Sequence, residues 1–209
     1  MSKAKNVHEF IAKNRQAIAE NPECGVSHYN LAVGLLGIGE FEEAEKELFE
    51  AIEHSPTLAE AYVQLGGLAM RRDDLQSCLE FNQRATRVKP GFSEGWGNIG
   101  FVHMQRGEID EAIKALEKAT RFNFRYVQAY ATLANAYLMK GRVDDAIETN
   151  FKALELAPDF AVAHNNLAIA YLEKNEAAKA YEHAQKAEEL GYDVAPEIMA
   201  DIDAMQAAG

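Results

Sequence analysis

The sequence predicts an all-α protein built as a solenoid of helix-turn-helix units, and a 34-residue period is the main evidence. Five successive blocks follow one another without insertion or deletion: 25–58, 59–92, 93–126, 127–160 and 161–194. A second observation is that the same block positions carry the same kinds of side chain. A period of this length is typical of one supersecondary unit that is repeated and that packs on its neighbours.

Ring, aliphatic and small side chains recur in phase through the five blocks. The fourth block position is a ring in every case: His28, Tyr62, Trp96, Tyr130 and His164. The eighth position is small: Ala32, Gly66, Gly100, Ala134 and Ala168. The twentieth position is also small, and the twenty-seventh is alanine throughout: Ala51, Ala85, Ala119, Ala153 and Ala187. Small residues at fixed places let two helices approach closely, so these positions are expected to form the scaffold.

Each block is expected to contain two helices, because its apolar residues recur with a helical rather than a strand period. We place helix A at block positions 2–14 and helix B at positions 17–30. Position 15, between them, carries residue types that accept a left-handed backbone. These residues are Gly39, Asp73, Gly107, Gly141 and Asn175. Prolines near the ends of three helices B (Pro56, Pro90 and Pro158) disfavour further helix.

Both ends of the chain keep the phase of the blocks. Residues 1–24 match a lone helix B that packs on the first block, and we predict an N-terminal capping helix there. Residues 195–209 match the start of a sixth block, with Pro196 at the beginning of a helix and Ile202 on its packing face. The predicted organisation is therefore a cap at 1–24, five repeats over 25–194 and a cap at 195–209.

The chain resembles the tetratricopeptide-repeat family over nearly its whole length, through the ring at position 4 and the small residues at positions 8, 20 and 27. The resemblance implies a right-handed superhelix with five full repeats. It also implies that helices A line the concave face. Helix positions 4, 7, 8 and 11 cluster on one side and must pack. Positions 2, 6, 9 and 13 lie opposite, with 5 and 12 at the margin, and are expected to face a partner.

Composition excludes several classes of function. The net charge of −12 argues against binding nucleic acid through its phosphates. No run of eighteen apolar residues is present, so we expect no membrane insertion. Residues 1–16 lack the continuous apolar segment of a secretory signal, and the two cysteines cannot form a disulfide framework. The expected location is the cytoplasm.

A row of hydrogen-bonding side chains occupies position 6 of the blocks. It consists of Asn30, Gln64, Asn98, Thr132 and Asn166. Such a row is able to pair with the backbone of an extended peptide regardless of its sequence. Asparagine is also common at this position of the repeat family, so the row is also consistent with a general feature of the scaffold.

Beside this row the expected groove is apolar. Position 9 includes Phe101 and Asn135, position 12 includes Met70 and Met104, and position 13 includes Arg71. Methionines beside an aromatic ring suit an amphipathic helix or an apolar peptide. Part of position 12 is expected to pack on the next repeat instead, and the chain's own terminal helix or another copy is an alternative occupant. The predicted groove residues are Asn30, Gln64, Met70, Arg71, Asn98, Phe101, Met104, Thr132, Asn135 and Asn166.

No enzyme chemistry is predicted. The histidines are scattered, with His54 and His183 placed on different helices B, and no ligand set for a metal is expected. No glycine-rich phosphate loop and no nucleophile beside a base can be assigned. Chaperone-binding members of the family hold a carboxylate with basic residues at positions 5 and 9. This chain has residues such as Tyr29 and Val33 at these positions, so binding of a chaperone's C-terminal carboxylate is not expected.

The predicted function is a non-enzymatic scaffold without cofactors that binds a protein or peptide segment across repeats two to four. The alternative is a scaffold that forms homo-oligomers through the ends of the repeat stack. Binding of single-stranded RNA is a third class, which the negative charge disfavours.

Overall fold

The structure is a computed structural model in which residues 2–208 are described, with side chains described for residues 6–207. All regular elements of the described chain are α-helices joined by short turns, and successive helices pack against each other from α1 to α5 and from α7 to α12. The chain divides into two compact units, 1–99 and 100–209, and the division falls inside one helix, α6 (Ser93–Gln105). Each unit is a stack of helices that has its own hydrophobic core. The fold is an all-α helical repeat solenoid.

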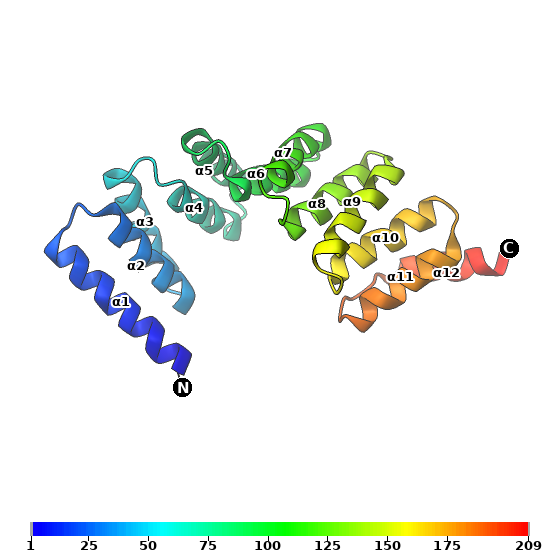
Figure 1. The fold of residues 1–209 in the computed structure, drawn as a ribbon, viewed down its shortest axis with the longest axis horizontal. Helices are drawn as coiled ribbons and strands as arrows, with labels where there is room; N and C mark the ends of the chain where they lie inside the picture. The colour runs from blue at the N-terminus through cyan, green and yellow to red at the C-terminus, as the bar shows by residue number, and fades with distance from the viewer. Residues whose placement is uncertain (1, 209) are drawn as a thin grey trace. The chain divides into compact units, whose positions relative to one another are not determined.

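The first unit holds the helices that are blue to green-cyan in Figure 1. They are α1 (Ser2–Glu20), α2 (Gly25–Ile38), α3 (Phe41–His54), α4 (Ala59–Arg71), α5 (Leu75–Val88) and the beginning of α6. Helices α1 to α4 lie side by side in sequence order, and α4 pairs with α5.

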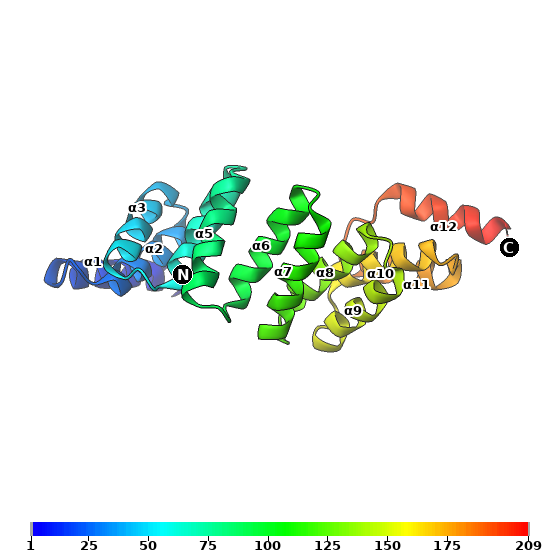
Figure 2. The same ribbon diagram turned by 90° about the horizontal axis from the view of Figure 1, so that it is seen from above.

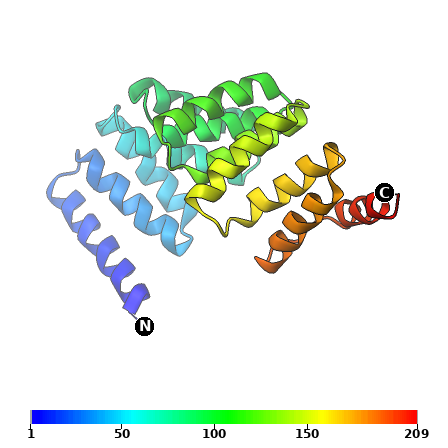
Figure 3. The same ribbon diagram turned by 45° about the vertical axis from the view of Figure 1, so that its right-hand side comes forward.

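The second unit holds the rest of α6 and the helices that follow it. They are α7 (Ile109–Phe122), α8 (Val127–Met139), α9 (Val143–Leu156), α10 (Ala161–Glu173), α11 (Ala177–Glu189) and α12 (Pro196–Ala208). Figure 3 shows α10 and α11 side by side, and Figure 2 shows α12 at the end of this unit, next to the α10–α11 pair.

The observed helices confirm the expected positions of helices A and B. Helix α3, for example, was expected over 41–54 and spans Phe41–His54. Position 15 has a positive φ in all five blocks, including the non-glycine residues Asp73 (56°) and Asn175 (58°). The backbone amides around Gly39 bond back to the last turn of α2, which closes that helix end. The division into five repeats and two caps stays a prediction.

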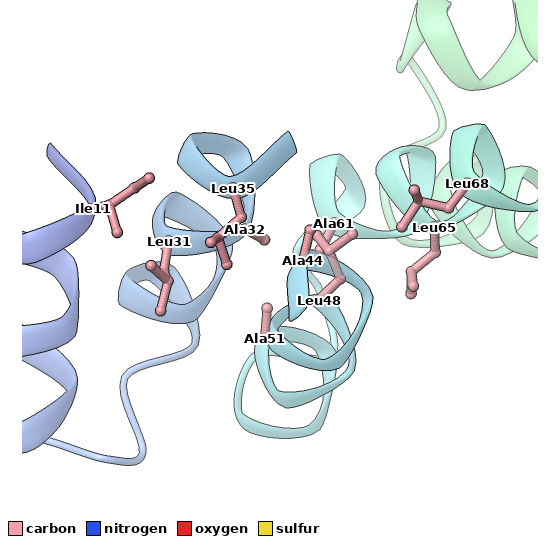
Figure 4. Close-up of a cluster of buried hydrophobic side chains, with 10 residues drawn as sticks. All are labelled: Ile11, Leu31, Ala32, Leu35, Ala44, Leu48, Ala51, Ala61, Leu65 and Leu68. Atoms are coloured by element: carbon pink, nitrogen blue, oxygen red, sulfur yellow. The ribbon is translucent and has the colours of Figure 1, made fainter. Parts of the chain in front are cut away.

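The core of the first unit shows why small residues recur at fixed positions. Ala32 and Ala44 are fully buried between α2 and α3, beside the buried side chains of Leu31, Leu35 and Leu48 (Figure 4). Alanine lets the two helix backbones approach, and the leucines then fill the space between successive pairs. Ile11 of α1 packs against the same cluster, so the N-terminal helix shares the core of the first unit.

The second unit contains two clusters of the same kind. One lies between α7, α8 and α9 and includes Leu116, Leu133 and Tyr137. The other joins α10, α11 and α12 and includes Leu167, Ala184 and Ile202. Ile202 is fully buried, so α12 is packed through the face that its phase predicted.

Exposed ion pairs link successive helix pairs in both units. A basic residue at block position 14 reaches an acidic residue near the start of the preceding helix B: Arg72 to Glu45 at 2.8 Å, Lys140 to Asp110 at 2.8 Å, and Lys174 to Asp144 at 2.7 Å. Pairs this exposed contribute little to stability one by one. Their regular placement is a consequence of the repeated geometry.

Candidate binding surface of helices A

Burial separates the scaffold positions of helices A from the positions expected to face a partner. Positions 4, 7 and 8 are buried or nearly so, whereas position 13 is exposed in all five blocks. Position 9 is exposed at Val33 (39%) and Phe101 (40%), and also at Asn135. Exposed large apolar side chains at these positions mean that the solvent-facing side of helices A includes apolar surface as well as polar groups.

The row at position 6 is partly committed to the scaffold. In the first unit the Asn98 amide donates to Oδ1 of Asn82 at 3.0 Å, and the Asn82 amide donates to the carbonyl of Cys78 at 2.8 Å. Asn82 is fully buried on helix α5. Its amide approaches the backbone of Gly66 so closely that a Cβ there would lie 2.4 Å from it, which explains the glycine at that position.

The same relay recurs in the second unit. Asn166 donates to Oδ1 of Asn150 at 3.4 Å and to the carbonyl of Ala131 at 3.1 Å, and Asn150 donates to the carbonyl of Ala146 at 3.0 Å. Asn166 is only 6% exposed. Its donor atoms therefore stabilise neighbouring helices rather than face a partner, which makes it a structural residue.

The other members of the row differ. The Thr132 hydroxyl donates to the carbonyl of Gln128 at 2.8 Å, a bond within its own helix. Asn30 and Gln64 are half-buried, and their side chains make no hydrogen bond to another described residue. A continuous ladder of five available side chains is thus not present, and the available amides of the row are Asn30 and Gln64.

Position 12 is more buried than the sequence suggested. All five of its residues are half-buried, and Leu36, Met104, Leu138 and Leu172 pack against the core clusters. Met104 in particular rests on the core that includes Leu116 and Tyr137. The apolar part of the surface is therefore carried by position 9 and by Met139 at position 13, which is 56% exposed.

Arg71 of α4 contacts an aromatic ring of the preceding helix, α3, which lies 30 residues earlier in the chain. Its guanidinium lies 3.8 Å from the centre of the Phe41 ring, a cation–π arrangement. The two side chains, with Glu45 and Leu68, border a shallow cavity of about 240 Å³. Arg71 is exposed and its guanidinium rests on the Phe41 ring, which suits recognition of an acidic or polar group.

A larger cavity of about 550 Å³ lies at the C-terminal end of the second unit, between α10 and α12. Ile169, Leu172 and Glu173 of α10 line one side, and Ile198 and Met205 of α12 line the other. Helix α12 therefore borders the groove positions of α10, so the chain's own terminal helix shapes this end of the surface. Met70 and Asn135, also predicted groove residues, lie on other helices and do not line this cavity.

Three of the ring side chains at position 4 have a polar role besides packing. A ring nitrogen of each lies near the carbonyl of the proline six residues earlier: His28 Nε2 at 2.8 Å from Pro22, Trp96 Nε1 at 2.8 Å from Pro90, and His164 Nε2 at 3.1 Å from Pro158. A carbonyl only accepts, so each ring nitrogen is the donor. The ring therefore ties the start of helix A to the preceding turn.

The histidines are scattered in the sequence, but helix packing pairs His54 and His183 each with a ring on helix A. The His28 and His54 ring centres are 5.7 Å apart, and His28 Nδ1 lies 2.6 Å from a Glu47 oxygen. In the second unit, His164 Nδ1 lies 3.0 Å from His183 Nδ1. The residues are 19 to 26 positions apart in the chain, so only the packing of helix A on helix B brings them together.

The two pairs differ in electrostatics. Burial acts to lower the pKa of His28, but the hydrogen bonds with Glu47 and Pro22 outweigh it, so the pKa is raised above its usual value. Burial, and after it the nearby His164, lower the pKa of His183. The first pair therefore favours a charged imidazole, and the second favours a neutral one.

Comparisons with known proteins agree with the repeat architecture. Models of the TPR repeat and of the tetratricopeptide repeat match residues 100–141, 127–160 and 151–182. The chain thus carries tetratricopeptide repeats within residues 100–182. No curated protein matches its sequence significantly.

Solved structures share the fold. YrrB, described as a TPR protein with an unusual peptide-binding site, is 23% identical with a TM-score of 0.72, and the match covers 92% of this chain and 97% of YrrB. MamA is 24% identical with a TM-score of 0.69, covering 81% of this chain and 92% of MamA. The pilF protein of Pseudomonas aeruginosa is 16% identical with a TM-score of 0.80, covering 99% and 92%. Identities this low establish the fold alone.

None of the described helices combines the length and the apolar character needed to cross a membrane.

Proposed function

We propose that the protein is a non-enzymatic interaction scaffold and that the exposed face of its helices A binds a segment of a partner protein. The observation that carries the proposal is the exposure of Phe101 on a helix whose opposite face is buried. Repeat solenoids commonly bind through the surface that their stacked helices form. The peptide-binding site named for YrrB, which has this fold, is consistent with such a role.

In the second unit we propose Phe101 and Asn135 as the central contacts. Phe101 offers an aromatic anchor, and aromatic residues are enriched among the energetically important contacts of interfaces. Asn135 offers an amide that makes no hydrogen bond to another described residue, so it remains able to pair with a peptide backbone. Met104 contributes through the shape of the surface, because it also packs on the core.

In the first unit we propose Asn30, Gln64 and Arg71 as polar contacts, with Met70 as an adaptable apolar neighbour. Arg71 is exposed and oriented by Phe41, so it is able to recognise a carboxylate or a carbonyl of the partner. The proposed partner segment is thus mixed in character, with an apolar anchor and hydrogen-bonding backbone groups.

The test is a double variant, Phe101→Glu with Asn135→Arg, which changes exposed side chains and leaves Met104 in place. We expect this variant to lose most of the partner that the wild type captures from native lysate, because a carboxylate replaces the apolar anchor. Binding is measured by quantitative mass spectrometry and then by titration with the isolated partner. A loss of at least 10-fold in affinity is expected, which corresponds to about 1.4 kcal/mol or more.

Phe122→Glu is the matched control, since Phe122 is comparably exposed (48%) but lies at the end of helix α7, a helix B of the same unit. It should bind like the wild type, and all three proteins should have the same melting temperature. Retained capture by a folded double variant, or an equal loss in the control, contradicts the proposed surface.

End-to-end self-assembly is the alternative, and the cavity beside α12 together with the exposed Phe10 of α1 supports keeping it. Sedimentation velocity at several concentrations distinguishes the two, because a strictly monomeric protein at all of them removes the alternative.

A further inference from the structure

A group of titratable side chains lies between α2 and α3 in the first unit. Its residues are not part of the proposed binding surface. Glu47, Glu50 and His54 follow one another on α3 at spacings of three and four residues, so they share one face of that helix. His28 of α2 lies opposite them, 2.6 Å from Glu47. One ligand atom from each of His28, Glu50 and His54 lies within 4.8 Å of the other two.

From this geometry we propose that His28, Glu50 and His54 form a binding site for a divalent transition metal ion, with Zn²⁺ as the ion that the donors suit best. Two imidazoles and one carboxylate are a ligand set that zinc accepts in proteins. Nitrogen and oxygen donors without a thiolate do not favour the softer Cu(I) ion, and two imidazoles do not favour Ca²⁺ or Mg²⁺.

His28 is already oriented for such a role. Its Nε2 donates to the carbonyl of Pro22 at 2.8 Å, which fixes the ring and leaves Nδ1 as the nitrogen that binds the ion. A metal-bound histidine usually donates its other ring N–H in this way, to a carbonyl or a carboxylate. Binding at Nδ1 releases the proton of that nitrogen to solvent, and the bond to the metal ion takes the place of the hydrogen bond to Glu47.

The remaining ligands are close to the required spacing and free to adjust. Donor atoms bound to one tetrahedral zinc ion lie about 3.3–3.6 Å apart, given bond lengths of about 2.0–2.2 Å. Glu50 Oε2 and His54 Nε2 are 3.6 Å apart in this structure. Their side chains are 51% and 25% exposed, so small rotations are able to bring them onto an ion beside the buried His28.

The α10–α11 pair supplies an internal comparison. The ring centres of His164 and His183 are 5.3 Å apart, against 5.7 Å for His28 and His54, and their Nδ1 atoms are 3.0 Å apart. The His164 Nε2 also donates to the carbonyl of Pro158. No carboxylate joins them in a ligand group within the described part of the chain. Two imidazoles alone provide a weak site, so specific binding is expected at the first pair and not at the second.

The test uses the full-length protein without a histidine tag, freed of metal by a chelator, and titrated with Zn²⁺ alone. Isothermal titration calorimetry and competition with a zinc-binding dye measure affinity and stoichiometry. We expect one ion per chain, and at least a 10-fold loss of affinity in both His54→Ala and Glu50→Gln. Zn²⁺ should also raise the melting temperature of the wild type, since it binds the folded state, and raise it less in the two variants.

His183→Ala is the matched control and should bind Zn²⁺ as the wild type does. Glu50→Gln keeps the proposal testable if His54→Ala fails to fold, because Glu50 is exposed and its replacement is isosteric. The proposal is overturned if the wild type binds no zinc at micromolar concentration, or if Glu50→Gln binds as tightly as the wild type. It is also overturned if His183→Ala loses as much affinity as the ligand variants.

Discussion

In both the α2–α3 pair of the first unit and the α10–α11 pair of the second, a histidine at block position 4 donates Nε2–H to a proline carbonyl six residues earlier. In both, Nδ1 of that ring meets the side chain 19 residues later, at block position 23. The partner is Glu47 in the first pair and His183 in the second. The repeat therefore sets where the ring lies, whereas the helix B side chain opposite the ring differs between the two pairs.

The difference lies in what surrounds each ring. Burial disfavours the protonated form of both imidazoles; the hydrogen bonds with Glu47 and Pro22 outweigh burial at His28, whereas the nearby His164 adds to it at His183. The shifts go in these directions: the pKa of His28 is raised and that of His183 is lowered. Two helix pairs with nearly the same backbone therefore have opposite preferences for a proton.

The largest expected effect comes from removing the ring in each pair. His28→Ala should lower the free energy of unfolding by about 2–3 kcal/mol, because it leaves the Glu47 carboxylate and the Pro22 carbonyl without their donor. His164→Ala should cost about 1–2 kcal/mol, because its partners are an imidazole and a carbonyl and no carboxylate is left without a donor. Urea unfolding in the presence of a chelator measures the cost, and hydrogen exchange assigns it to the helix pair. Equal losses of unfolding free energy in His28→Ala and His164→Ala would contradict the claim that the ring's partner makes the two helix pairs differ.

A smaller effect is expected from pH, through His183. Its pKa is lowered in the folded state, so folding favours the neutral ring. The contribution to stability is complete above the ordinary value of about 6.5 and is lost as pH falls from there through the folded-state pKa. The difference in unfolding free energy between the wild type and His183→Gln should therefore shrink from pH 8 to pH 5.

A proton NMR titration of the His183 ring gives the pKa directly and should place it below the usual range for histidine. A His183 pKa above that range contradicts both the sign of the stability change and the proposed contrast with His28.

The smallest effect is expected from the exposed ion pairs, which are alike in the two units. Arg72→Gln in the first unit and Lys174→Gln in the second should each lower the free energy of unfolding only slightly, and less at high salt. If the two variants lose equally little free energy of unfolding, the partner of the position-4 ring remains the main difference between the two helix pairs. A cost above that of His28→Ala would mean that the linkage between helix pairs is stronger than exposure suggests.

Much of the fold was predictable from the chain because repeated local signals agree. The glycine, aspartate and asparagine residues at position 15 do adopt positive φ, as Gly39 and Asp73 show. The phase of residues 195–209 predicted the buried face of α12, which Ile202 confirms. Helical period and turn chemistry are properties of a few neighbouring residues, so they are readable without tertiary contacts.

The candidate surface was harder to predict, because helical phase says which side a residue faces but not what lies opposite. Asn166 has the phase of a groove residue, yet it is buried and bonded to Asn150 and to Ala131. Asparagine at position 24 of the second and fourth blocks, where other blocks have leucine or alanine, was the available signal for these relays. Met104 has the phase of a residue at the margin of the groove, but it also packs on the core.

The repeat and the bounds of its helices are readable from the amino-acid sequence alone, because they follow from local backbone preferences. The face that each helix buries is readable too, because it follows from the spacing of apolar residues. Which side chains meet between helices A and B is visible in the tertiary structure alone. His28 with His54 and His164 with His183 are neighbours because two antiparallel helices close on small residues. Contacts between residues far apart in the chain depend on helix register and distance, which no local pattern contains.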